Sequence, residues 1–152
     1  MPPPAVSGDN VLKIGVFEPS TGDSASGGKK EMLGMQYANS ETPTVTVGGQ
    51  EYQIQLVYAD NGSSTDKALT AATQLVSEGV SLVLGSYGSG VSIAAGPTFG
   101  NAGLPAIGVT CTNPMVTAGN DYYFRICFLD PFQGTVLANF AMEKFQAKTA
   151  YL

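Results

Sequence analysis

The sequence predicts an α/β fold in which helices cover both faces of a mainly parallel sheet. Two observations support this class. Short apolar runs alternate five times with segments of helical periodicity, and this alternation is typical of parallel strands joined by right-handed crossovers. Hydrophobic residues make up 43% of the 152 residues and charged residues only 12%, a balance that allows one domain to bury a core.

The first half of the chain predicts two strands of this sheet, a hairpin and two helices. The run VLKIGVF at 11–17 has the length and composition of a buried strand. Gly48-Gly49 separates two β-rich runs and so predicts a hairpin whose longer arm enters the sheet. The elements expected here are a strand at 11–17, a loop at 18–30, a helix at 29–40, hairpin strands at 44–47 and 51–59, and a helix from a cap at Ser64 or Thr65 to about Glu78.

The second half predicts three further parallel strands, two helices and the start of another strand. Pro97 is awkward inside the first of these helices, so either that helix starts late, with Pro97 in its first turn, or it kinks. The elements expected here are strand 80–84, helix 90–102, strand 106–109, loop 110–121, strand 122–128, helix 131–146 and strand 148–152. The expected strand order is 2-1-3-4-5, which gives a three-layer α/β/α, Rossmann-like (flavodoxin-like) fold. Since a strand at 148–152 is an unusual end for a domain, we expect the chain to be a piece of a longer protein.

Two loops rich in small residues follow the apolar runs VSLVLG and LPAIGV, within residues 85–114. Ligands of parallel α/β sheets bind at the carboxyl ends of the strands, where such loops gather. The loops offer the hydroxyls of Ser86, Ser89, Thr110 and Thr112 together with many backbone N–H groups. Neutral donors of this kind suit a small carboxylate and do not suit bond-breaking chemistry.

Several classes of function are excluded by composition. The chain has no histidine, which excludes Ser-His-Asp and Cys-His catalysis and any His-ligated metal. We therefore expect no enzyme, no cofactor and no metal. The net charge of −5 argues against nucleic acid, and no window reaches the apolar length of a membrane span. Asp60 lies in a predicted turn, and Asp66 lies in the first turn of a predicted helix. Acidic residues are favoured at both positions for structural reasons, which explain them better than a catalytic role does. Cys111 and Cys127 leave a disulfide and two free thiols equally open.

Two glycine-rich stretches resemble phosphate-binding motifs but lack residues that those motifs require. The Gly- and Ser-rich loop at 18–30 resembles a P-loop, but Gly28 is followed by Lys29-Lys30 rather than by Lys-Ser or Lys-Thr. Gly85, Gly88 and Gly90 form a G-x-x-G-x-G string that resembles a dinucleotide-binding motif. That motif normally follows the first strand and has an acidic residue about twenty residues further on. Here the string follows the third strand, and no acidic residue occurs between Glu78 and Asp121.

Four blocks of sequence together resemble a known family. They are IGVFEPSTGDSASGG, LVYADNGSSTDKALTAATQLV, VLGSYGSGVSIAAGPTFGNAGLPAIGVTCTNP and YYFRICFLDPFQGTVLANFA. In this order they are similar to the first lobe of type I periplasmic solute-binding proteins, and most of all to the branched-chain amino-acid (Leu/Ile/Val) receptors of ABC importers. The resemblance covers nearly all of 11–152. It implies an N-terminal solute-binding lobe at 11–130, and at 131–152 a crossover helix and strand that would begin a missing second lobe. The first residues, MPPPAVSG, instead indicate by their composition a disordered lead-in at 1–10.

The resemblance also implies roles for individual residues. Ser89 and Thr112 would each offer a hydroxyl and a backbone N–H to the α-carboxylate of an amino acid. The Thr110 carbonyl and the Thr112 hydroxyl would meet the α-ammonium, and Ser86 and Tyr87 would line the same wall. Two departures stand out: no aromatic residue is present near Ser26-Gly27, where relatives often carry one, and the acidic partner that the second lobe supplies is absent.

As a function, the resemblance implies an amino-acid binding lobe, here truncated to about half of its protein, that serves an ABC permease in the full-length parent. Binding by the single lobe is expected to be weak. The expected location is periplasmic or extracellular, including a cell-surface lipoprotein, with no signal segment in this chain. The alternative is an isolated lobe, engineered or released by proteolysis, that acts as a folded scaffold or as a homodimer. Its contacts would be an exposed crossover helix at about 133–145 and the edge strand at 148–152.

Overall fold

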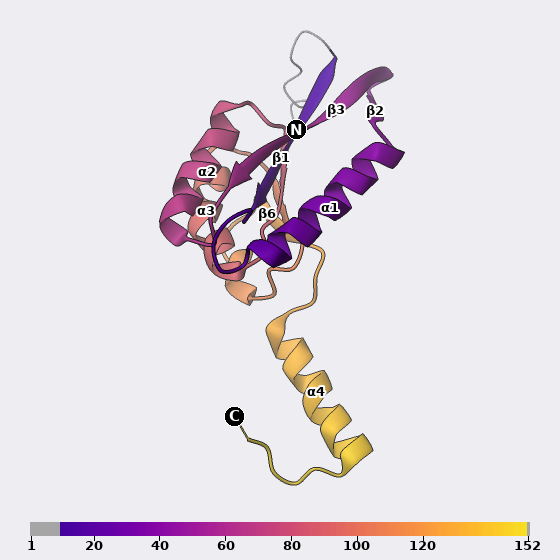
Figure 1. Cartoon of the computed structure of the whole chain (residues 1–152), viewed down its shortest axis with the longest axis vertical. Coiled ribbons are helices and arrows are strands. Elements are labelled where there is room, and N and C mark those ends of the chain that lie inside the picture. Colours follow the sequence, from indigo (N-terminus) through magenta and orange to yellow (C-terminus); the bar gives the residue numbers. More distant parts are fainter. Residues whose placement is uncertain (1–9, 152) are drawn as a thin grey trace.

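The computed structural model describes residues 10–151, so the expected lead-in lies outside the described residues except for Asn10. Figure 1 shows a sheet flanked by helices, with a last helix that extends away from them. The elements are β1 (Val11–Glu18), α1 (Ala25–Glu41), β2 (Thr44–Val47), β3 (Gln50–Asp60), α2 (Thr65–Ser77), β4 (Leu82–Leu84), α3 (Ser89–Asn101), β5 (Ala106–Gly108), a 3-10 turn (Pro114–Val116), β6 (Tyr123–Arg125) and α4 (Asp130–Phe145).

The strands form one sheet in the order β2-β3-β1-β4-β5-β6. Every pair is parallel except β2 with β3, which are the two arms of the predicted hairpin. Among the parallel strands the order is therefore the predicted 2-1-3-4-5, with the short arm added at the edge. β1 lies in the middle of the sheet, and its Gly15 pairs with Val57 on one side and Val83 on the other.

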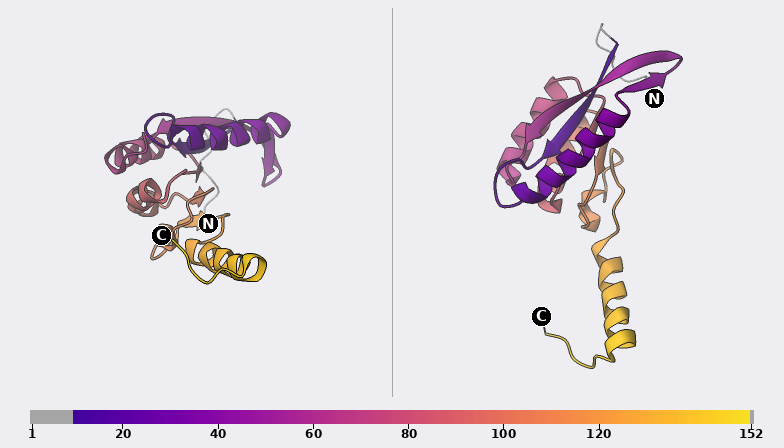
Figure 2. Two further views of the ribbon diagram at one scale, coloured as in Figure 1. Left: turned by 60° about the horizontal axis from the view of Figure 1, so that its bottom comes forward. Right: turned by 45° about the vertical axis from the view of Figure 1, so that its right-hand side comes forward.

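The helices form the two outer layers of a three-layer α/β/α fold. α1 covers one face of the sheet, and α2 and α3 pack side by side on the other (Figures 1 and 2). The core lies between the sheet and the α2–α3 layer, where Phe17 meets Phe99 edge to face at 5.4 Å and Phe99 lies 6.3 Å from Tyr123. The predicted fold class is confirmed.

Most predicted boundaries lie within two residues of those in the structure, such as β4, which begins at Leu82 rather than at residue 80. Three other differences have a physical reason. α1 begins at Ala25 rather than Lys29, because Ser24 O accepts hydrogen bonds from the N–H groups of Gly27 and Gly28 and so starts the helix within the glycine-rich loop. α3 runs without a break from Ser89, so the alternative of a late start with Pro97 in the first turn is wrong. β6 is limited to the three residues that pair with β5, although the sequence predicts a strand over 122–128.

The C-terminal part is the largest difference. α4 extends away from the sheet and its flanking helices in all views (Figure 2), and none of its described residues is buried. The predicted strand at 148–152 is wrong over Lys148–Tyr151, which is irregular, because no other strand of the described chain lies beside it to pair with. Among the described helices, none combines the length and hydropathy that crossing a membrane requires.

Candidate ligand-binding site

The two predicted loops lie side by side at the carboxyl ends of β4 and β5. Because these strands are parallel neighbours, the segments that follow Leu84 and Gly108 leave the sheet at the same edge. One hydrogen bond joins the segments directly: Ser89 Oγ accepts from the backbone N–H of Asn113 at 3.1 Å. Two of the predicted residues, Ser89 and Thr112, are thus held next to each other.

Ser89 is the first residue of α3. The N-cap of that helix is Gly88, so no side chain caps the first turn. N–H groups in the first turn lack partners within a helix, and the helix dipole adds partial positive charge there. Ser89 is half-buried and its hydroxyl is still able to donate. The start of α3 can therefore hold a carboxylate with neutral donors.

The two threonines of the second loop differ in their surroundings. Thr112 is half-buried, and its hydroxyl has no hydrogen-bond partner within residues 10–151, whereas its carbonyl accepts from the N–H of Asp130 at 3.1 Å. Thr110 is exposed, and its hydroxyl donates to Oε1 of Glu31 on α1. This places a carboxyl group beside Thr110, on the side of the site that the resemblance assigns to an ammonium group.

Ser86 and Tyr87 contribute in different ways from those expected. Ser86 is fully buried, and its hydroxyl accepts from Asn61 Nδ2 at 2.8 Å and donates to the Tyr87 carbonyl at 3.2 Å. Its side chain therefore supports the wall from within and does not reach the surface. Tyr87 is 40% exposed, and its ring lies against Gly27 of α1. The structure thus places an aromatic ring at Ser26-Gly27, where this sequence has no aromatic residue of its own.

Asn61 is a site residue that the sequence analysis missed. It is fully buried at the end of β3, where Nδ2 donates to Ser86 Oγ and Oδ1 accepts from the N–H of Ser63 at 3.1 Å. The neighbouring Asp60 accepts from Thr21 Oγ1 and from the N–H groups of Ser20 and Gly62. Desolvation opposes ionisation of Asp60, but these hydrogen bonds outweigh it and hold the pKa of its carboxyl well below the ordinary value.

Arg125 is the second residue that was missed. It is the only arginine in the sequence, and from β6 its guanidinium donates to the carbonyls of Cys111, Asn113 and Pro114 and to Thr117 Oγ1, at 2.9 to 3.2 Å. One planar group thereby fixes the whole segment that carries Thr112. Nothing in the spacing of the sequence connects β6 with this loop, so only the folded arrangement identifies the role.

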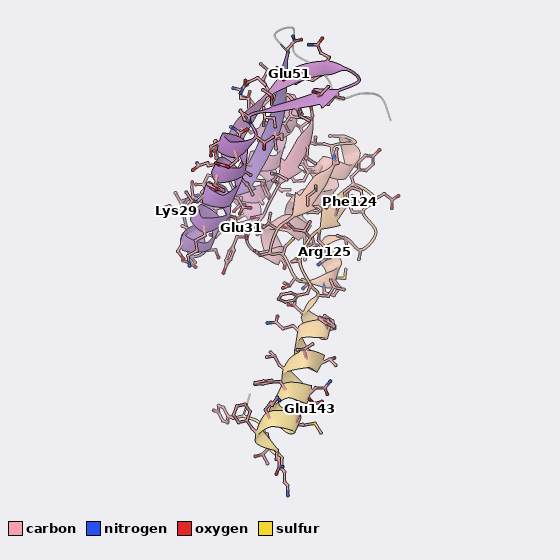
Figure 3. All side chains as sticks on the ribbon, turned by 90° about the vertical axis from the view of Figure 1, so that its right-hand side faces the viewer. Lys29, Glu31, Glu51, Phe124, Arg125 and Glu143 are labelled. Carbon is pink, nitrogen blue, oxygen red and sulfur yellow. The ribbon has the colours of Figure 1, made fainter. Side chains whose placement is uncertain are left out.

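Glu18 and Glu31 form the third feature that was missed. Glu18, at the end of β1, is 1% exposed, and its Oε2 accepts from the N–H of Tyr87 at 2.7 Å. Burial is the main cause that raises the pKa of Glu18 to about 10, and the nearby Glu31 carboxyl adds to the rise. In Figure 3, Glu31 lies on the side of α1 nearer to Arg125, and Lys29 lies on the other side.

The two cysteines are free thiols in the structure, which answers the question that the sequence left open. Cys111 is buried and Cys127 is half-buried. Burial is the main cause that raises the pKa of the Cys111 thiol above its ordinary value. The sulfur at the centre of the second loop is therefore a small apolar group that fills space behind Thr110 and Thr112.

Comparison with known proteins shows which family the chain is similar to. The family model described as periplasmic binding protein matches residues 11–152. Among curated relatives, a Leu/Ile/Val-binding protein homolog 2 from Brucella abortus is 30% identical over 136 residues, and an amino acid binding protein from Pseudomonas aeruginosa is 34% identical over 137 residues. Each alignment covers 89% of this chain and 36% of the relative. The chain thus spans little more than a third of the length of these curated relatives.

Solved structures agree with the sequence comparison. The leucine binding protein LivK from Thermotoga maritima superposes with a TM-score of 0.83 at 34% identity, over 91% of this chain and 39% of that one. The branched-chain amino acid transporter substrate binding protein LivJ from Streptococcus pneumoniae, determined in complex with isoleucine, gives 0.81 at 34% identity, over 91% and 40%. Both are solute-binding proteins, as the family description indicates.

Proposed function

Given that the chain belongs to the periplasmic binding protein family, we propose that it is an amino-acid binding lobe in which the Ser89 and Thr112 loops hold the α-carboxylate of a branched-chain amino acid. Its work is binding and delivery, and it involves no catalysis. Residues 11–130 form the lobe, and residues 131–152 lead toward a second lobe in the whole protein.

One observation carries this proposal. The hydrogen bond from the Asn113 N–H to Ser89 Oγ brings the start of α3 close to the Thr112 hydroxyl, which has no hydrogen-bond partner within residues 10–151. The polarity of this place matches an amino acid. The positive end of α3 lies at Ser89, and the Glu31 carboxyl lies beside Thr110. A carboxylate at the first position and an ammonium at the second would each meet a complementary group.

The choice of a branched-chain amino acid rests on the relatives. The names of the similar proteins refer to leucine, to Leu/Ile/Val and to branched-chain amino acids, and one of those structures contains isoleucine. By the same reasoning, the whole protein would act in the periplasm or outside the cell and would pass its ligand to the membrane permease of an ABC importer. The Tyr87 ring beside Gly27 would cover the ligand's apolar side chain.

The test is a titration of the 15N-labelled chain with leucine, isoleucine, valine, glutamine and aspartate, followed by two-dimensional NMR. We expect shifts confined to 86–89 and 110–113, with a Kd of about 1 mM rather than about 1 μM, a loss of roughly 4 kcal/mol for a single lobe. Ser89→Ala should weaken binding about tenfold, roughly 1.4 kcal/mol. The control Ser77→Ala removes a hydroxyl bonded only within α2 and should leave binding unchanged. A well-dispersed spectrum that no amino acid shifts would contradict the proposal.

A second candidate function is self-association, and the surface of α4 favours it. Six large apolar side chains of this helix are 47% to 72% exposed, namely Phe132, Val136, Leu137, Phe140, Met142 and Phe145. An apolar surface of this kind marks a contact with another protein surface. A mass measurement in solution distinguishes the two candidates: a stable dimer that binds no amino acid would favour the second, and a monomer that binds would favour the first.

A further inference from the structure

We propose that Glu18 and Glu31 form a proton-sharing carboxyl pair that ties the two ligand loops together, and that both are positioning residues for amino-acid binding. This inference rests on the proposed function and deepens it, because it assigns to the first lobe an acidic element of the site.

The pair connects the loops through a continuous chain of contacts. Glu18 Oε2 accepts from the Tyr87 N–H at 2.7 Å, which fixes the loop after β4. Glu31 Oε1 accepts from the Thr110 hydroxyl, which fixes the loop after β5. The two carboxyl groups lie close enough between β1 and α1 for the Glu31 carboxyl to raise the pKa of Glu18, and each of them keeps one buried oxygen without a hydrogen bond among the described residues. Gly85 makes room for this arrangement, because a β-carbon there would lie 2.7 Å from Glu18 Oε1 and 2.2 Å from the Phe17 carbonyl oxygen.

The remaining carboxyl oxygens show why the pair needs a proton. Glu18 Oε1 and Glu31 Oε2 are both buried and meet no donor in the described chain. No cation neutralises them, since the one ion pair within residues 10–151 joins Lys13 to Glu78. The other titratable group that faces them is Tyr123 of β6, whose hydroxyl is occupied by the Gly85 carbonyl. Because each carboxyl group has a buried oxygen that meets no described donor, the two cannot both stay ionised, so one of them keeps its proton and donates it to the other.

The consequence for binding is a fixed geometry and a single negative charge. A doubly ionised pair would separate and would release Tyr87 and Thr110, whereas a fully neutral pair would offer nothing to an ammonium group. With one shared proton, the pair holds both loops and places about one negative charge next to Thr110. A glutamine at position 18 reproduces the neutral partner, because its amide oxygen accepts from Tyr87 and its NH2 group donates to Glu31.

The first experiment observes the pair without any ligand. The chain is labelled with 13C at the glutamate carboxyl carbons and titrated from pH 4 to pH 9. We expect one carboxyl signal to remain in the protonated position to pH 8 or above, and this signal to be lost in Glu18→Gln. If every glutamate signal moves to the ionised position below pH 6, the pair shares no proton and the inference is overturned. This result is independent of whether the lobe binds amino acids.

The second experiment measures leucine affinity by NMR in matched variants. We expect Glu18→Gln to bind leucine with an affinity within twofold of that of the unmodified chain. Glu31→Ala should bind at least fivefold more weakly. Because Glu31 is half-buried, its truncation disturbs the fold less than truncation at position 18 would. Glu41→Ala, exposed at the other end of α1, serves as the control and should bind normally. Normal binding by Glu31→Ala would overturn the positioning role, and so would a loss in Glu18→Gln as large as the fivefold loss expected for Glu31→Ala. If the unmodified chain binds no amino acid, the proposed function fails, and the carboxyl titration alone decides on the pair.

Discussion

The ring of Tyr87 lies so close to Gly27 that a β-carbon on Gly27 would fall 2.5 Å from the ring carbon Cζ. The contact joins the loop after β4 to the first turn of α1, and the absence of a side chain at Gly27 is what permits it. Tyr87 is 40% exposed even so, so part of the ring remains free to meet a ligand.

Gly27→Ala should move the Tyr87 ring without straining the backbone, because Gly27 is already helical. We expect a loss of about 1 kcal/mol in the free energy of unfolding and a clear change in the ring signals of Tyr87, measured by urea denaturation and NMR. Gly34→Ala is the control on the same helix, since a β-carbon there would meet nothing within 4 Å. It should stabilise the chain by up to about 1 kcal/mol. Equal effects of the two substitutions would show that the Tyr87 contact has no energetic importance.

Arg125→Lys should loosen the second loop, although it keeps the charge. A lysine cannot reproduce the fork that reaches three carbonyls and a hydroxyl at once. We expect a destabilisation of about 2 kcal/mol, with amide shifts concentrated in 111–117, and a larger effect for Arg125→Ala. Urea denaturation and NMR of both variants provide the check. Shifts that spread evenly over the sheet, with the loop unchanged, would contradict the role of the guanidinium.

The order of the parallel strands was predictable, because each apolar run carries its own signal and right-handed crossovers leave few topologies. The start of α1 was harder to predict, since Gly27 and Gly28 are poor helix formers and belong to the helix only because Ser24 and the Tyr87 ring hold them there. Pro97 was a similar case. Proline disfavours a helix interior, but burial of α3 against α2 and the sheet outweighs this preference.

Within the site, the sequence was enough to predict the serine and threonine residues of the two loops. It was not enough to predict the carboxyl groups that hold these loops in place. Ser89 and Thr112 lie in the short segments that follow β4 and β5, so local sequence locates them. Glu18 meets Tyr87 across 69 residues and Glu31 meets Thr110 across 79. No local pattern encodes contacts at that separation, and a buried glutamate at the end of a strand looks like an ordinary loop acid in the sequence.

The two cysteines should react at very different rates. Cys111 is buried and its pKa is raised, so little thiolate forms at neutral pH and a reagent cannot reach it. Cys127 is half-buried and more accessible. With Ellman's reagent at pH 7.5 we expect one thiol to react within minutes and the second only as the chain unfolds. Cys127→Ser should abolish the fast phase and Cys111→Ser the slow one. Two equally fast thiols would mean that the second loop opens readily.

Stability should fall as the pH rises above 5, and Glu18 is the reason. Its pKa is about 10 in the folded chain and about 4.5 in the unfolded one. Between these values the folded state holds a proton that the unfolded state releases. The favourable contribution is therefore complete below pH 4.5 and decreases toward pH 10, by at most about 1.4 kcal/mol per pH unit. Asp60 acts in the opposite sense. Because its pKa is lowered in the folded chain, it stabilises the fold while ionised, and this contribution is lost only when Asp60 is protonated at acid pH.

We therefore expect maximum stability near pH 5 and a loss of up to about 4 kcal/mol between pH 5 and pH 8, measured by urea denaturation across this range. Glu18→Gln cannot ionise, so it should flatten the profile and be more stable than the unmodified chain at pH 8. Glu143→Gln, on the exposed surface of α4, should leave the profile unchanged. A stability that is constant or rises between pH 5 and pH 8 in the unmodified chain would show that Glu18 is ionised in the folded state. The contacts of Tyr87 and Thr110 would then have to be held by two carboxylates whose repulsion a bound cation relieves.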